Sequence, residues 1–142
     1  MAGRKGGMIM NHMEEVRALR AIIEPHYNCA QSLLVPFADV TGIPKEKAME
    51  LGFLFGGGMH HGSVCGTLTA AYMILGMAGC SKEDAAGLLR TFKEKHGSEL
   101  CRDLLAASAK AGLVKKQHCD GLVFEVCEYL DDFFTERERA AG

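Results

Sequence analysis

The stretch from Leu68 to Ala78 is the feature that most restricts how this chain can fold, because it is apolar on nearly every side. A helix of this kind is stable only where other elements surround it. It also falls short of the roughly 20 apolar residues that a membrane-spanning helix needs. The sequence therefore predicts a buried central helix and no segment that crosses a membrane.

Prolines divide the first third of the chain into short helices. Residues Asn11 to Glu14 resemble a capping box, and Pro25 is expected to end the first helix. A second helix is predicted from Asn28 to Val40, kinked or shortened at Pro36, and a short third helix from Pro44 to Leu51. The expected apolar stripe of the first helix comprises Met13, Val16, Leu19, Ala21 and Ile23.

Helix start and stop signals continue in the second half. Ser81 suits the N-cap of a helix that ends before Gly97, and Ser98 suits the N-cap of one that ends at Gly112. The last helix is predicted to start near Cys119, where apolar residues begin to recur three and four positions apart. No segment alternates as a half-buried strand does. The predicted fold class is all-α, a compact bundle of six or seven helices.

The chain's ends and charge narrow the kind of protein further. Residues 1–10 are glycine-rich without the apolar core of a signal peptide, so we expect a disordered N-terminus there. Residues 11–142 are expected to form a single cytoplasmic domain. A formal net charge of -2 is untypical of nucleic-acid binders. The acidic stretch from Asp120 to Glu138 predicts a solvated helix face or, alternatively, a docking surface for a basic partner.

Four of the six cysteines share a predicted setting near helix N-termini: Cys29, Cys65, Cys101 and Cys119. Unpaired N–H groups and partial positive charge at such ends lower a thiol pKa. Four neighbouring thiolates would repel one another unless a metal, an iron–sulfur cluster or disulfide formation removed their charge. Cys80 and Cys127 are expected to pack as small apolar side chains.

The spacing of the cysteines is less specific. No C-x-x-C sequence is present, which argues against a thioredoxin-like or zinc-ribbon site. Because C-x-x-C-H is also absent, the sequence does not predict a covalently attached haem. A shared four-cysteine site and separate core cysteines both remain compatible with the spacing alone.

The segment from Phe55 to Gly66 is expected to form a loop, because three consecutive glycines are poor helix formers. Their backbone can approach a neighbouring group closely. The segment lacks the lysine of a phosphate-binding loop and follows no predicted strand, so it does not predict nucleotide binding.

Several of these features occur together in one known family. They are Asn28-Cys29-Ala30-Gln31, Phe55-Gly56-Gly57-Gly58-Met59 with Gly62, Val64-Cys65-Gly66, Phe92 through His96-Gly97-Ser98 to Cys101-Arg102-Asp103-Leu104, and Cys119. This order resembles the C_GCAxxG_C_C family of small proteins, which is described as redox-active and is common in anaerobic bacteria and archaea. The resemblance covers Tyr27 to Tyr129. The central motif is only partly kept, because Val64, Gly66 and Thr69 stand where the family has Gly, Ala and Gly.

The resemblance implies a function for the four cysteines. The family is similar to the iron–sulfur part of split-Soret cytochromes, which implies a [2Fe–2S] cluster on Cys29, Cys65, Cys101 and Cys119. Gly56, Gly57, Gly58 and Met59 would form its cover. Without a haem-attachment motif, only the cluster half of this comparison applies.

Histidines near these positions are further candidate ligands. His60 and His61 follow Met59 in the glycine segment, His26 precedes Cys29, and His118 precedes Cys119. Histidine replaces cysteine as a ligand in Rieske-type centres. Exposed side chains are the alternative interpretation for each.

Three functional hypotheses follow. The first is an electron-transfer or redox-sensing protein with a cluster on the four cysteines. The second is a cluster-free thiol–disulfide protein with Cys65 as the nucleophile. The third is a partner-binding helical module, packed or stabilised by structural zinc. An apolar central helix also suggests a homodimer. The redox partner is not identified, and no catalytic triad or carboxylate pair is visible.

Overall fold

The computed structural model describes residues 12–141, and every regular element within them is helical. This confirms the all-α class. The elements are α1 (His12–Ala21), α2 (Cys29–Leu34), α3 (Ala38–Thr41), α4 (Lys45–Gly52), the wide helical turn η2 (Gly58–Gly62), α5 (Gly66–Met77), α6 (Lys82–His96), α7 (Cys101–Lys110) and α8 (Lys115–Ala141). The count of six or seven is not confirmed, because Pro36 separates α2 from α3 and η2 lies within the expected glycine loop.

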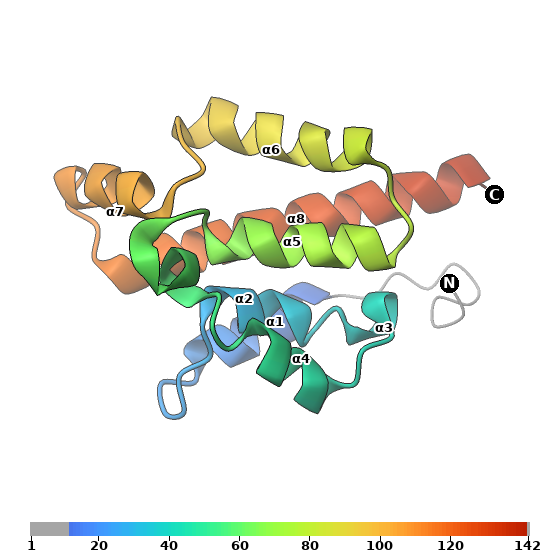
Figure 1. The fold of residues 1–142 in the computed structure, drawn as a ribbon, viewed down its shortest axis with the longest axis horizontal. Coiled ribbons are helices and arrows are strands. Elements are labelled where there is room, and N and C mark those ends of the chain that lie inside the picture. Colours follow the sequence, from blue (N-terminus) through green and yellow to red (C-terminus); the bar gives the residue numbers. More distant parts are fainter. Residues whose placement is uncertain (1–11, 142) are drawn as a thin grey trace.

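Helices α5 and α8 lie side by side along the long axis, with α6 on one side and α1 to α4 on the other (Figure 1). Side chains such as Leu68, Ala71 and Ile74 of α5 are buried in the core. One side of α5 is open, however, since Tyr72 is 39% exposed and Met77 is 54% exposed. No helix in the described part of the chain is long and apolar enough to cross a membrane.

The first helix differs most from its prediction. It ends at Ala21, before Pro25, and Ile23 is 73% exposed rather than buried. Val16 of the predicted stripe is buried, and the other buried residues of α1 are His12 and Arg20. Their spacing of four places them on one face, and the two cations are accommodated because carboxylates from other helices meet them. The expectations for residues 1–10 and for a cap at Asn11 lie outside the described residues.

Helix starts were predicted unevenly. Ser81 caps α6 as expected, and Asp84 completes the capping box. The N-cap of α7 is Leu100 rather than Ser98, whose hydroxyl accepts from Leu100 N and donates to Asp103. Helix α8 begins at Lys115, so Cys119 lies in its second turn and not in its first.

Candidate functional site

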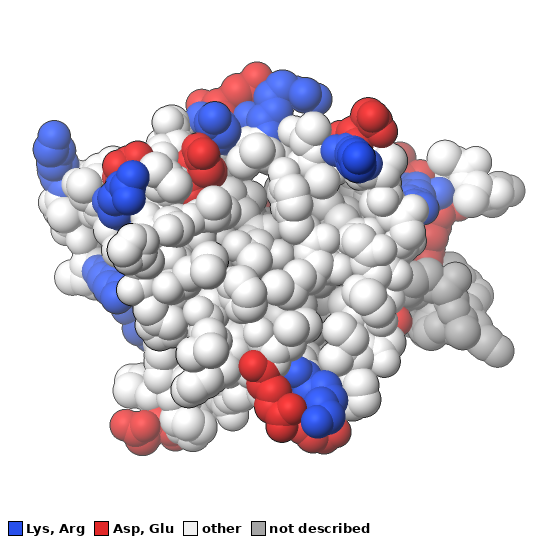
Figure 2. All heavy atoms as spheres, viewed as in Figure 1, with Lys and Arg blue, Asp and Glu red and all other residues white. Residues whose placement is uncertain are grey.

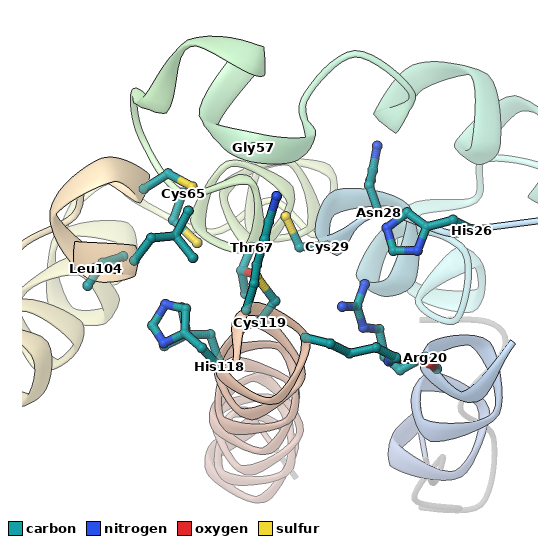
Figure 3. Close-up of a pocket in the computed structure, with 15 residues that line it drawn as sticks. Arg20, His26, Asn28, Cys29, Gly57, Cys65, Thr67, Leu104, His118 and Cys119 are labelled. Atoms are coloured by element: carbon teal, nitrogen blue, oxygen red, sulfur yellow. Dashed lines mark hydrogen bonds between the residues drawn. The ribbon is translucent and has the colours of Figure 1, made fainter. Parts of the chain in front are cut away.

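All four cysteines singled out in the sequence line one cavity of about 400 Å³ at one end of the bundle (Figure 3). They come from four separate segments. Cys29 and Cys101 are the first residues of α2 and α7, Cys65 directly precedes α5, and Cys119 belongs to α8. The remaining lining residues are Arg20, His26, Asn28, Gly57, Thr67, Leu104, Leu105, Lys115, Lys116, His118 and Leu122.

A capping box holds Cys29 in place. Asn28 Oδ1 accepts a 2.8 Å hydrogen bond from Gln31 N, and Gln31 Oε1 accepts a 3.0 Å bond from Asn28 N. The amide of Asn28 also donates to the carbonyls of Gly52 and Phe53, both at 3.0 Å. The start of α2 is therefore tied to the end of α4.

Backbone pairing joins the segment of Cys65 to the segment of Cys101. Cys65 N donates to Glu99 O at 2.9 Å, and Cys101 N donates to Ser63 O at 2.7 Å. These reciprocal bonds surround a bridge between Val64 and Leu100. Two cysteines far apart in the sequence are thus held by main-chain hydrogen bonds, independently of any side chain.

Two glycines are required by close contacts beside the cysteines. A Cβ atom on Gly58, which has a φ of 64°, would lie 2.5 Å from Ser63 O and 2.8 Å from Cys101 Cβ. A Cβ atom on Gly66 would lie 2.7 Å from Cys29 Sγ and 2.5 Å from Phe55 O. The alanine of the family motif would therefore not fit at Gly66 without a shift of Phe55 or Cys29.

Of the four residues predicted to cover the cluster, only one lines the cavity. Gly57 lines it, whereas Gly56, Gly58 and Met59 do not, and Met59 is 59% exposed. His60 and His61 are also exposed and lie outside the lining. His26 and His118 do line the cavity. Of the two other cysteines, Cys127 is buried in the core, and Cys80 contacts Arg137 Nη1.

The thiol pKa values run opposite to the expectation from helix N-termini. Burial, and after it the neighbouring Cys29, raise the pKa of Cys65 to about 11, although hydrogen bonding from Thr67 and Leu68 opposes them. Burial and then Cys29 also raise the pKa of Cys101 and of Cys119. Desolvation and mutual repulsion thus outweigh the local helix effect. A cation bound among the sulfurs would reverse this balance.

The positively charged residues of the cavity are not among those predicted from the sequence. Arg20, Lys115 and Lys116 line it, and among the described residues no Asp or Glu does. Positive charge on Arg20 and Lys115 lowers the pKa of Cys119 against the effect of burial. The available signal for Arg20 was its position four residues after the buried Val16. Lys115 and Lys116 lie before the apolar stripe of α8, so their positions in the sequence do not indicate that they line the cavity.

The four cysteine sulfurs suit a metal or cluster that prefers sulfur ligands. They are not arranged around one point, as the ligands of a single ion would be. All six cysteines are free. Within residues 12–141, no three Cys, His, Asp or Glu side chains converge closely enough to hold a metal ion as they stand. The buried Thr67 hydroxyl, which bonds to no nitrogen or oxygen, faces the same cavity and lies beside Cys65.

The comparisons with known proteins identify one family. No curated protein and no solved structure matched the chain. A family model described as "Putative redox-active protein (C_GCAxxG_C_C)" matches residues 27–133, which include all four cavity cysteines. Because the match covers most of the sequence, the chain belongs to the C_GCAxxG_C_C family of redox-active proteins.

Proposed function

We propose that this protein transfers electrons or senses redox state through a [2Fe–2S] cluster bound by Cys29, Cys65, Cys101 and Cys119. One observation carries the proposal: cysteines from four separate segments line a single cavity whose wall, among residues 12–141, has cations and no carboxylate. Thiolates are the usual ligands of such clusters, and a bound cluster supplies one-electron redox chemistry.

The geometry supports two metal atoms better than one. A single tetrahedral ion such as structural zinc needs four donors converging on one point. Each iron of a two-iron cluster takes only two thiolates, so the proposal does not require three sulfurs to converge. The main-chain pairing between the segments of Cys65 and Cys101 supports this arrangement, because it brings both segments to the cavity. The Thr67 hydroxyl beside Cys65 is placed to donate to sulfur, and the cations offset the charge of the thiolates.

The test is metal analysis of anaerobically purified protein. Iron and acid-labile sulfide in equal amounts, with charge-transfer absorption in the visible range, are expected for the wild type. Cys65→Ser should lose both, whereas Cys80→Ser, which changes a cysteine outside the cavity, should keep both. Stoichiometric zinc without sulfide would contradict the proposal.

A cluster-free thiol–disulfide protein is the second candidate, favoured by the electrostatic coupling of Cys29 to each of the other three thiols. The raised pKa of Cys65 works against its role as the nucleophile. Iron-free protein that loses two hydrogens per cysteine pair on mild oxidation would support this candidate over the cluster.

A cytoplasmic homodimer is the setting we propose. A reducing compartment would keep the six free cysteines available. No charged residue occurs from Leu51 to Ser81, and Figure 2 shows the centre of one face, over α5, without Lys, Arg, Asp or Glu. A second copy would cover this face, where Tyr72 and Met77 are exposed. Light scattering at twice the chain mass, shifted to the monomer by Tyr72→Glu, would support it.

A further inference from the structure

The guanidinium of Arg20 is fixed beside the cysteine cavity. Its side chain is only 4% exposed, although it lines the cavity wall. Nε donates to Asp120 Oδ1 at 2.7 Å, and Nη1 donates to Tyr27 O at 2.8 Å. Figure 3 shows the Arg20 side chain among the residues that line the cavity. A buried charge held by such directional bonds cannot turn away to be screened by water.

The carboxylate of Asp120 is shared between two cations. Lys116 Nζ donates to its two oxygens at 3.0 Å and 2.9 Å, and to Arg20 O at 2.7 Å. Two cations and one carboxylate leave an excess of one positive charge beside Cys119, the residue that precedes Asp120. Arg20 and Cys119 line the same cavity, so this charge acts on the sulfur from within the site.

We infer that the Arg20–Asp120 pair sets the reduction potential of the cysteine centre, with Arg20 raising the potential and Asp120 lowering it. This rests on the proposed function. Four thiolates around an oxidised [2Fe–2S] core carry a total charge of −2. One electron from a low-potential donor makes this −3 without forming or breaking a bond. A fixed positive charge stabilises the more negative state, and a fixed negative charge opposes it.

The ion pair between Arg20 and Asp120 connects α1 to α8 beside the cysteine cavity. Arg20 lies before residues 27–133, the part that matches the family model, so it is a contribution of this chain that the four-cysteine pattern does not include. Arg20 is a positioning residue in this account: it contacts Asp120, Tyr27 and Ser32 and acts on the centre through its charge.

The test is the midpoint potential of iron-loaded protein, measured by anaerobic spectroelectrochemical titration. Arg20→Gln should lower the potential and Asp120→Asn should raise it. Each should change the reduction equilibrium about tenfold or more, which is about 59 mV for one electron. Arg20→Lys should stay near the wild type. The double variant Arg20→Gln with Asp120→Asn should return toward the wild type, and it leaves no buried charge unpaired.

Arg139→Gln is the matched control. It removes an arginine whose side chain is 73% exposed, roughly 28 Å farther along α8 from Asp120 by helical rise. Its potential should equal that of the wild type, since exposed charges are screened within about 10 Å.

The outcomes separate the inference from the proposed function. Iron-loaded variants whose potentials do not move, or move in the same direction for Arg20→Gln and Asp120→Asn, would overturn the inference alone. Purely structural damage gives no reason for shifts of opposite sign. A wild type without iron or sulfide would overturn the proposed function and the inference with it. If Arg20→Gln fails to load iron, an unchanged or lowered potential in Asp120→Asn still overturns the inference.

Discussion

Helix α1 carries a buried cation at each end, and each meets a carboxylate of α8, but the two ends differ in charge balance. At one end, one cation faces two carboxylates: His12 donates to Asp131 at 2.5 Å and to Asp39 at 2.8 Å, stacked on Phe37. At the other end, two cations share Asp120. Only the second end adjoins the cysteines. We infer that the His12 cluster fastens helices together, whereas the Arg20 cluster would offset the negative charge of the proposed iron–sulfur centre.

The largest effect that would sharpen this comparison is expected from His12→Ala. Removing His12 takes away the buried positive charge that Asp131 faces, so the free energy of unfolding should fall by about 3–5 kcal/mol. Urea titration of the purified variant measures this loss. Iron content of the protein that remains folded should match the wild type. Loss of iron in proportion to stability would remove the distinction between the two ends.

Raising the pH into the alkaline range should progressively remove the stability that the His12 cluster contributes. Burial acts to lower the pKa of His12, but its hydrogen bonds to Asp131 and Asp39 prevail and raise it to about 9 from 6.5. The imidazolium therefore stabilises the fold fully below pH 6.5, and the contribution is lost as pH rises through 9. The loss is on the order of 3 kcal/mol.

The buried cysteines also favour unfolding as pH rises, because their raised pKa values keep them protonated longer in the folded state. Urea midpoints of wild type and His12→Ala between pH 6 and 10 separate the two causes. The difference between the proteins should shrink with pH. A constant difference would show that His12 does not titrate in this range.

The smallest expected effect belongs to the cavity end. Gly66→Ala restores the residue of the family motif but must displace Phe55 O or Cys29 Sγ, at a cost of about 1–3 kcal/mol. Iron content should fall as Cys29 shifts. Gly76→Ala in the same helix is the control, since its Cβ would meet nothing within 4 Å, and it should be neutral or slightly stabilising. Equal iron in both variants would contradict the tight contact at Gly66.

Local signals predicted local structure well. The N-cap at Ser81, the break at Pro36 and the apolar α5 all depend on neighbouring residues, and the structure contains each of them. The four cysteines were selected by order and resemblance, and the fold places them around one cavity.

Long-range effects escaped prediction. Arg20 meets Asp120 across 100 positions of sequence, and the apolar stripe drawn through Ile23 hid the face that Arg20 occupies. The thiol pKa values were expected from helix ends alone, yet burial and the proximity of Cys29 decide their direction. Both are properties of the assembled molecule, which no single segment contains.

The backbone bonds from Cys65 N to Glu99 O and from Cys101 N to Ser63 O hold the two cysteine segments together before a cofactor is loaded. Bringing together residues 36 positions apart has a loop-closure entropy cost of about 3 kcal/mol. Because main-chain hydrogen bonds hold the pair, folding bears this cost before any metal arrives. Half of the ligand set is then preorganised in the apoprotein. A cluster would then bind with higher affinity, because its binding free energy would not be needed to bring these two segments together.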